Sequence, residues 1–316
     1  MSFKKFWFCD VLLCLGLPVS QAQESAPSYL EESSAVATDT WGEVPQPGKL
    51  FGVIGSTDHC FDDFISPMTN PVYFEDPRTL TEARFIFLNH HIPSALGGQD
   101  AQLYAAQLRA ALTENLSLVA AKDGYIVSQN PVLDDGFADL ALGLKYNLFR
   151  DPEAQRLVSA GFSYALPIGS TRALQGRTDG EFHLYLTGGT QIFEEFHWLS
   201  ATGFRLPSDT PSGNQMWYWS NHIDWQVMGS KWYVFTEANW FHYMSSGDAF
   251  PAAVGGLDLF NLGGAGVAGN DIVTGAYGMK YKPVRNIEIG AAYEIPYTSQ
   301  KDILQNRWTF DLIFRF

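Results

Sequence analysis

The sequence contains few cysteines and comparatively few cations. Only 3 of its 316 residues are cysteine, and 20 are Lys or Arg against 34 Asp or Glu. Cys9 and Cys14 lie in the first 22 residues, which we interpret below as an export signal that is removed. Cys60 is then left without a partner for an internal disulfide. We interpret it as an unreactive buried thiol. The excess of acidic residues makes nucleic acid a poor partner.

Long apolar runs are also missing after Val19. A membrane-spanning helix needs about 20 consecutive apolar residues. Any residence in a membrane therefore depends on strands, which satisfy their backbone hydrogen bonds in lipid only when they close into a barrel. Aromatic residues, by contrast, are plentiful, with 9 Trp, 14 Tyr and 23 Phe. Barrels place such side chains in belts at the two membrane interfaces, although an aromatic-rich core is the alternative.

The first 22 residues have the features of an export signal. Lys4 and Lys5 precede an apolar stretch at 6–19, and Ser20 and Ala22 are small residues at the positions that a signal peptidase reads. We predict cleavage after Ala22. The removed segment carries a net charge of +1, so the mature chain has a net charge of about -15 instead of -14.

Residues 23–78 form a predicted periplasmic leader in two parts. Residues 23–58 are rich in Ser, Ala, Glu, Pro and Gly without a sustained period, which predicts a flexible acidic segment. Residues 59–78 alternate large apolar side chains with turn-forming residues and should pack against something. This part is either a plug that enters a barrel or a tether that docks a partner or peptidoglycan. The candidate plug residues are Phe61, Phe64, Tyr73 and Phe74.

The last ten residues, Arg307–Phe316, alternate strictly between two faces. A period of two fits only a strand. The opposite face is mostly polar, as expected where one side meets lipid and the other meets a wet interior. Soluble sandwiches also end in amphipathic strands, so the segment alone does not decide between a barrel and a sandwich. The closing-strand residues on the apolar face are Trp308, Phe310, Leu312, Phe314 and Phe316.

Twelve segments from Thr81 onward are strand candidates. Most run for ten to fourteen residues, which matches a tilted membrane crossing and exceeds the usual length of a globular strand. We therefore predict an all-β fold, a transmembrane antiparallel up-and-down barrel of about 12 strands at 79–316. The candidates are 81–92, 101–112, 115–127, 137–149, 156–168, 181–193, 197–206, 215–227, 231–243, 270–282, 286–297 and 303–316.

The predicted connections alternate between short and long. Outer-membrane barrels have short periplasmic turns and longer external loops, so an even strand number places both chain ends in the periplasm. The longest link, 244–269, has apolar runs around Val254 and Leu257 that could fold into the pore mouth, although a surface loop is the simpler interpretation. The short turns are 113–115, 150–155, 194–196, 228–230 and 283–285, and the other long links are 93–100, 128–136, 169–180 and 207–214.

Several predicted strands show which face meets lipid. In 138–148 the apolar residues at even positions oppose a set that includes Asp139 and Lys145, and Trp217 and Trp219 oppose a polar set in the same way. A charge at the lipid-facing midplane would cost a few kcal/mol, which fixes the polar set as inward. The predicted lumen residues, which either contact a solute or fill a narrow interior, are Tyr218, His222, Asp224, Tyr233, Glu237, Asn239, His183 and Tyr185.

The inward set predicts an acidic lumen that disfavours anions. Asp139, Asp224, Glu237, Glu288, Glu294 and Asp311 outnumber Lys145, Lys280, Arg307 and Arg315. We find no metal-ligand spacing, phosphate loop or nucleophile elbow, and we expect no catalytic residue, metal or cofactor. His90 and His91 point to opposite faces of a strand, so they do not share a site, and we interpret them as membrane-interface residues.

The stretch Asp135–Ala165, followed by Leu166–Gly169, resembles the outer-membrane β-barrel family named after the meta-pathway of phenol degradation, a family of MetA-pathway-like transporters. The shared pattern is a Gly-Asp-like loop, a strand of the type DLxLGLKY, a short acidic turn and a strand ending in Leu-Pro-x-Gly. The resemblance implies a channel or transporter for small, often aromatic or hydrophobic, molecules. It transfers no functional residue.

Taken together, these patterns predict an outer-membrane channel for small, neutral or hydrophobic molecules, including aromatic ones. A structural or surface barrel without transport is the alternative, and a lipid-modifying enzyme is a third. The expected partners are outer-membrane lipids, the barrel assembly machinery and a small-molecule solute. The oligomeric state stays open.

Overall fold

The computed structural model describes residue 50 and residues 52–316. The predicted signal peptide and most of the predicted leader at 23–58 lie outside the described residues. In the described part of the chain, no helix is both long enough and apolar enough to span a membrane. The helices there are short 3-10 turns, η1 (His59–Phe61), η2 (Ser94–Leu96), η3 (Thr171–Ala173) and η4 (Val227–Gly229).

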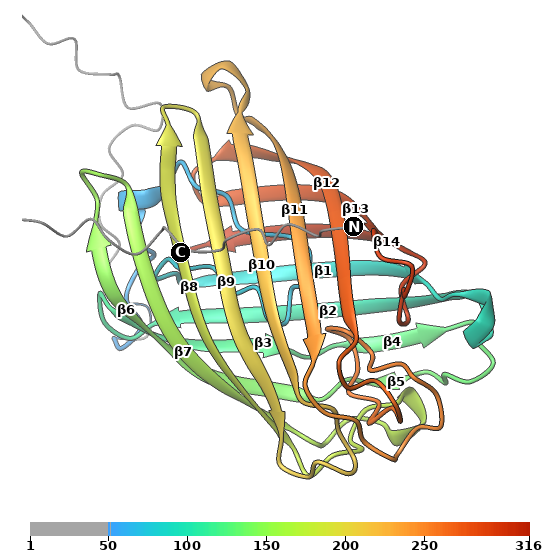
Figure 1. The fold of residues 1–316 in the computed structure, drawn as a ribbon. Coiled ribbons are helices and arrows are strands. Elements are labelled where there is room, and N and C mark those ends of the chain that lie inside the picture. The colour runs from blue at the N-terminus through green and yellow to red at the C-terminus, as the bar shows by residue number, and fades with distance from the viewer. Residues whose placement is uncertain (1–49, 51) are drawn as a thin grey trace, which may run out of the picture. The chain divides into compact units, whose positions relative to one another are not determined.

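Fourteen strands of the described chain form one antiparallel sheet (Figure 1). From β6 to β14 each strand pairs with its neighbours in chain order, and β1 pairs with both β2 and β14, which closes the barrel. The strands are β1 (Glu82–His91), β2 (Asp100–Ala111), β3 (Leu116–Lys122), β4 (Tyr125–Ser128), β5 (Gly136–Phe137), β6 (Leu140–Asp151), β7 (Arg156–Leu166), β8 (Glu181–Phe193), β9 (Phe196–Pro207), β10 (Met216–Gln226), β11 (Trp232–Tyr243), β12 (Asp271–Val284), β13 (Ile287–Pro296) and β14 (Asn306–Arg315).

Two places in the wall are each filled by two strands in succession, β3 with β4 and the short β5 with the long β6. β3 and β4 both pair with β2, at successive stretches of that strand. β6 pairs with β3 and β5 pairs with β4, so the next position in the wall is also shared by two strands. The described wall therefore has 12 strand positions, and the predicted 12-stranded antiparallel barrel is confirmed. The predicted strands 115–127 and 137–149 are the ones that are interrupted, and 303–316 begins only at Asn306.

The alternation of side chains sets the two faces of the wall, as predicted. In β10, Trp217 and Trp219 are 39% and 49% exposed, whereas Tyr218 and His222, which point to the other face, are fully buried. In β6, Leu142 and Tyr146 face outward and Lys145 is buried. In β14, Trp308 and Phe310 are exposed and Leu312 and Phe314 are half-buried on the same outer face, and Phe316 follows the strand and is exposed.

Aromatic side chains gather in two outer belts near the strand ends. At the loop end, Tyr125 packs on Phe137, Tyr164 on Phe182, and Trp217 on both Phe204 and Trp240. At the turn end, Phe196 stacks on Trp225, and Trp232 packs on Tyr281. Belts of this kind occur at both membrane interfaces of outer-membrane barrels, because an aromatic ring tolerates both lipid and water.

Short turns lie at one end of the barrel and long loops at the other. The start of the described chain lies at the turn end, where the Thr57 N–H donates to the Phe316 carbonyl at 2.7 Å. The long link 244–270 differs from the simpler expectation of a surface loop, because it folds inward over the barrel mouth. Leu257, Phe260 and Leu262 are at most 4% exposed and belong to the main hydrophobic cluster.

Candidate functional site

Residues 61–80, hereafter the inner segment, lie inside the barrel. The candidate plug residues Phe61, Phe64, Tyr73 and Phe74 are at most 2% exposed. The segment bends sharply at Asn70, whose φ of 52° is left-handed and which precedes Pro71. Hydrogen bonds reach the inner segment from side chains on β1, β2, β6, β7, β8, β10, β11, β12, β13 and β14.

Glu75 binds two cations of the wall. Its carboxylate accepts hydrogen bonds from Arg109 at 2.7 and 2.6 Å and from Lys145 at 2.9 Å. Arg109 also donates to Glu82 at 2.9 Å. Burial alone would raise the pKa of Glu75, but Arg109 and Lys145 hold it at about 2. The carboxylate is therefore charged at neutral pH and joins the inner segment to β2 and β6.

A second charged cluster surrounds Ser66. The Ser66 hydroxyl donates to Asp76 at 2.9 Å and accepts from Arg315 at 2.9 Å, while Arg78 pairs with Asp76 at 2.7 Å. The Ser66 N–H donates to Glu288 at 3.1 Å. Burial acts to raise the pKa of Asp76, but Arg78 outweighs it and holds that pKa far below its usual range. This cluster joins the inner segment to β13 and β14.

Glu237 of β11 holds the inner segment by its backbone. Its carboxylate accepts hydrogen bonds from the consecutive N–H groups of Met68 and Thr69 at 2.7 and 2.6 Å, and from the Thr69 hydroxyl. Behind it, His222 Nδ1 lies 2.7 Å from Glu237 and His222 Nε2 lies 3.2 Å from Asp224. Two predicted lumen residues, His222 and Asp224, thus lie behind the carboxylate of a third, Glu237.

His197 completes this row, since its Nδ1 lies 2.8 Å from Asp224. It is fully buried and its ring packs against Phe64 with the ring centres 4.7 Å apart. Sequence reasoning missed His197. The signal was available, because His197, Leu199, Ala201 and Arg205 alternate with outward residues along β9.

The other predicted lumen residues also face inward, and most of them contact the inner segment. The Tyr218 hydroxyl donates to the Tyr73 carbonyl at 2.8 Å and lies 2.8 Å from His183 Nε2. Tyr185 stacks on His183 with the ring centres 4.7 Å apart. Asn239 Nδ2 donates to the Thr69 hydroxyl at 2.9 Å, and Tyr233 shares a buried cluster with Ile65 and Met68.

The predicted acidic lumen is wrong. Among the described residues, the buried charged side chains of the wall are close to balanced, because sequence reasoning overlooked five cations and two carboxylates. The cations are Arg84, Arg109, Lys122, Lys145, Arg205, Lys280, Lys282, Arg307 and Arg315, and the carboxylates are Glu82, Asp139, Glu181, Asp224, Glu237, Glu288, Glu294 and Asp311. Each carboxylate that enters the interior costs less when a cation accompanies it, which explains the balance.

Two further expectations also need correction. His90 is 1% exposed and its Nε2 lies 2.8 Å from the Ile303 carbonyl inside the barrel, so it is not a membrane-interface residue. Cys60 is exposed and not a buried thiol. The described residues contain no group of three or more His, Cys, Asp or Glu side chains placed to hold a metal ion.

The long loop closes the other end of the interior. Arg205 Nη1 donates to the carbonyls of Leu257 and Phe260 at 2.7 and 2.8 Å. Arg307 pairs with Asp258 at 2.8 Å, and the Asp302 carboxylate accepts the N–H groups of Gly255 and Gly256 at 2.8 and 2.9 Å. Inner segment and loop therefore form two consecutive layers across the barrel.

No protein-family model matches the sequence, and no curated protein matches it. Several solved structures, however, are similar in fold to this chain. An outer membrane channel from Pseudomonas putida F1 is similar with a TM-score of 0.53 and 12% identity, over 80% of this chain and 100% of that one. The NanC porin has a TM-score of 0.48 and 8% identity over 75% and 100%, and the KdgM porin 0.45 and 11% over 74% and 99%. The chain thus has the barrel fold of the Pseudomonas putida channel.

Proposed function

We propose that the protein is an outer-membrane channel for small uncharged molecules whose passage is closed by the inner segment. One observation carries this proposal. The barrel interior is occupied by a separate stretch of chain, held by hydrogen bonds from ten strands, and not only by the side chains of the wall. Such a stretch can be released without unfolding the wall.

The chemistry of the contact supports release. Glu75 on the inner segment pairs with Arg109 and Lys145 of the wall, while Asp76 and Arg78 pair with each other within the segment. Buried ion pairs contribute little net free energy relative to the solvated ions, because the Coulomb attraction is offset by desolvation. After release, water would solvate both surfaces. A permanent filler would gain more from apolar packing.

The solute class follows from the wall and from the family resemblance. Balanced wall charges favour no ion of either sign, so an uncharged solute fits best. Membership of the phenol meta-pathway family stays a proposal, and with it the preference for hydrophobic or aromatic molecules. The comparison structure with the same fold is named an outer membrane channel, which supports transport in place of an enzyme activity.

Outer-membrane localisation after signal-peptide export belongs to the same proposal. It is supported by the closed barrel, by its apolar outer face and by the two aromatic belts. The partners we propose are outer-membrane lipids, the barrel assembly machinery and the transported solute.

The test is the conductance of residues 23–316 refolded into a planar bilayer, compared with the same chain lacking residues 23–78. We expect rare or no steps from the full chain and frequent but small steps after the deletion, because the long loop still narrows the other end. Folding of both is checked by heat-modifiable migration on a gel. Steps of equal size and frequency in both would refute the closing role of the inner segment.

A structural barrel without transport is the second candidate, because inner segment and loop together fill the interior. Silence of both chains, with folding confirmed, would favour it. The third candidate, a lipid-modifying enzyme, would instead show loss of lipid acyl chains on incubation with outer-membrane lipids.

A further inference from the structure

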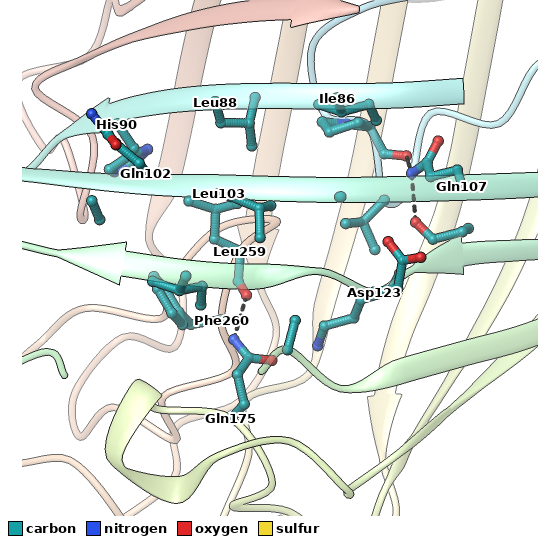
Figure 2. A pocket seen from close by; sticks show the side chains of 18 residues that line it. Ile86, Leu88, His90, Gln102, Leu103, Gln107, Asp123, Gln175, Leu259 and Phe260 are labelled. Atoms are coloured by element: carbon teal, nitrogen blue, oxygen red, sulfur yellow. Dashed lines mark hydrogen bonds between the residues drawn. The ribbon is translucent and has the colours of Figure 1, made fainter. Parts of the chain in front are cut away.

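The cavity shown in Figure 2 is too small for a ligand. It lies between Leu88 of β1, Leu103 of β2 and Phe260 of the long loop, and its volume of about 30 Å³ suffices for one water-sized molecule. A hollow of about 390 Å³ lies instead on the outer face of the wall, over β7, β8 and β9. A guest larger than water therefore fits this outer hollow better than the cavity.

Small side chains form the floor of the outer hollow. Gly188 of β8 lies at its centre, because it pairs with Val158 of β7 on one side and with Ser200 of β9 on the other. All three positions belong to the outer face, because they alternate with buried residues along their strands. The larger side chains that surround the floor are Phe149, Leu186 and Trp198.

Two bulges shape the wall beside the hollow, near the turn end. The register of β6 shifts between Asn147 and Phe149, and that of β8 shifts between Gln191 and Phe193. A bulge bends its strand and increases the local twist. In β6 the shift places Phe149 opposite Val158, so that an aromatic ring closes one side of the hollow.

The polar side chains in the deep part of the hollow are already paired. The Ser200 hydroxyl donates to the Ser220 carbonyl at 3.2 Å and accepts from Trp219 Nε1 at 2.9 Å. The Thr202 hydroxyl donates to the Tyr218 carbonyl at 2.8 Å. An apolar guest therefore packs against this part without displacing a hydrogen bond, as an acyl chain requires.

Arg156, the first residue of β7, lies at the mouth of the hollow and is exposed. Among the described residues, its guanidinium has no hydrogen-bond or ion-pair partner. Its cross-strand neighbour Asp151 accepts the Ala154 N–H at 3.1 Å instead. A guanidinium binds a phosphate through two parallel hydrogen bonds, so a phosphate fits this position.

The turn before Arg156 favours a particular headgroup. It carries Arg150, Asp151 and Glu153, but Arg150 is already bound, because it donates to both carboxylate oxygens of Asp58 at 2.8 Å. Two carboxylates are thus left beside one unpaired cation. They repel a headgroup that is anionic as a whole, whereas an amine headgroup carries an ammonium beyond its phosphate and complements them.

The hollow has the length and direction of a lipid chain. Thr190 pairs with Arg156 at the mouth, and Leu186 lines the hollow four residues further along β8. Four residues of a strand span about 13 Å. Because the mouth is at the turn end, the hollow runs from the headgroup level into the hydrocarbon region.

We infer that the outer hollow binds one glycerophospholipid of the periplasmic leaflet. Its phosphate lies on Arg156, its ammonium faces the turn 150–155, and one acyl chain packs over Gly188. These groups follow one another in an amine-headgroup lipid in the same order as the turn, Arg156 and the floor of the hollow. The inference rests on the proposed outer-membrane residence with the turns in the periplasm, and it does not depend on transport.

The test is native mass spectrometry of the full mature chain, purified in detergent and titrated with dioleoyl phosphatidylethanolamine. We expect one lipid to bind saturably. Phosphatidylglycerol and dioleoylglycerol should bind more weakly, because the first lacks the ammonium and the second lacks the phosphate. Arg156→Gln should raise the apparent Kd for phosphatidylethanolamine at least about tenfold, since it removes hydrogen bonds between two charged groups.

Filling the hollow tests the place of the acyl chain. Val158→Trp covers the floor from β7 and should abolish the saturable binding. Thr190→Trp fills the hollow from β8 and serves if the first variant does not fold, which heat-modifiable migration on a gel shows. Both residues line the hollow on the outer face, so neither change reaches the interior of the barrel.

Each kind of variant has a matched control at the turn end. Lys231→Gln removes an exposed cation just before β11. Val234→Trp adds a ring two residues after the first residue of β11, as Val158→Trp does in β7. Both controls should leave the apparent Kd unchanged. Conductance is a separate readout, which Arg156→Gln should not alter.

An equal loss of affinity in the controls, or unchanged affinity in Arg156→Gln or in both filled variants, would overturn the inference. So would binding of many lipids without a saturable first one, which marks ordinary contact with the bilayer. A dimer that Val158→Trp dissociates would also overturn it, because a second copy would then occupy the hollow.

The outcomes for the lipid site and for the channel are distinguishable. Saturable lipid binding, together with silence of the chain lacking residues 23–78, would support the lipid site and count against the channel. Conductance steps of that shortened chain, without saturable binding to the full chain, would overturn the lipid site alone.

Discussion

Glu237 accepts two consecutive backbone N–H groups of the inner segment, and we expect it to be the main single contact that keeps the barrel closed. Glu237→Gln turns an amide NH₂ towards these donors and removes the charge. Hydrogen bonds to charged groups contribute about 1.5–3 kcal/mol, and 1.4 kcal/mol changes an equilibrium about tenfold. Open events in single-channel recordings should therefore rise at least about tenfold.

Glu194→Gln is the matched control for this variant, because Glu194 is exposed in the turn between β8 and β9. It should leave the open probability unchanged. An equal response of both variants would mean that general charge, and not the Glu237 contact, controls closure.

The lowered pKa of the buried Glu75 carboxylate predicts that acid opens the channel. Its pKa is about 2 when the inner segment is docked, against an ordinary value of 4.5. A lowered pKa stabilises the docked state above the ordinary pKa, and this stabilisation is lost as the pH falls from about 4.5 towards 2. It amounts to about 3 kcal/mol at neutral pH. Openings should increase steeply over that range, and Glu75→Gln should flatten the dependence. An unchanged profile in Glu75→Gln would contradict this assignment.

At the scale of single residues, sequence reasoning could predict which side chains face inward but not what they bind. Alternation alone places Glu237 and Asn239 on the inner face. Their partners, Met68 and Thr69, are 168 to 170 residues away. Such pairs depend on the tilt of the wall and on where the inner segment bends, and neither leaves a local pattern.

Among the structural elements, the inner segment and the long loop obstruct the barrel one after the other. Deleting either one alone should leave the other narrowing the barrel, because the contact of Arg307 with Asp258 that holds the loop involves no residue of 61–80. We expect small conductance steps without residues 23–78, few steps without residues 246–268, and the largest steps when both are removed. Single-channel recordings of the three chains would show this order.

Full conductance after either single deletion would contradict the view of two layers. The control for the loop deletion is a Gly-Ser linker of equal length in place of residues 246–268. This linker keeps the connection between β11 and β12 and removes only the inward contacts of the loop.

The strands were predictable to within a few residues because long alternating segments are strong local signals. The break between β3 and β4 was missed, although Asp123–Gly124 is a pair typical of turns. The uninterrupted apolar alternation on both sides concealed it. The inward fold of the long loop had weaker signals, because its apolar residues fit a surface loop equally well in sequence.

For the whole molecule, the exposed Cys60 reports orientation. It lies at the turn end, where the Gln155 side chain donates to its carbonyl. If the turn end is periplasmic, a membrane-impermeant maleimide should not label Cys60 in intact cells and should label it after the outer membrane is permeabilised. Fluorescence of the labelled band on a gel measures this.

Asp248→Cys in a Cys60→Ser background provides the opposite control, because Asp248 is exposed in the long loop. It should be labelled in intact cells. The reverse pattern of the two thiols would place the turns outside and would contradict the proposed orientation.

The bond between Ser66 and Arg315 spans 249 residues, and the one between Ser66 and Glu288 spans 222. The inner segment is made early but its final partners are made last, so it cannot reach its place until the whole chain has been exported. Contacts this distant slow folding and prolong the time spent as an unfolded, aggregation-prone chain. Periplasmic chaperones should therefore limit the yield of this protein more strongly than that of a barrel that encloses no segment.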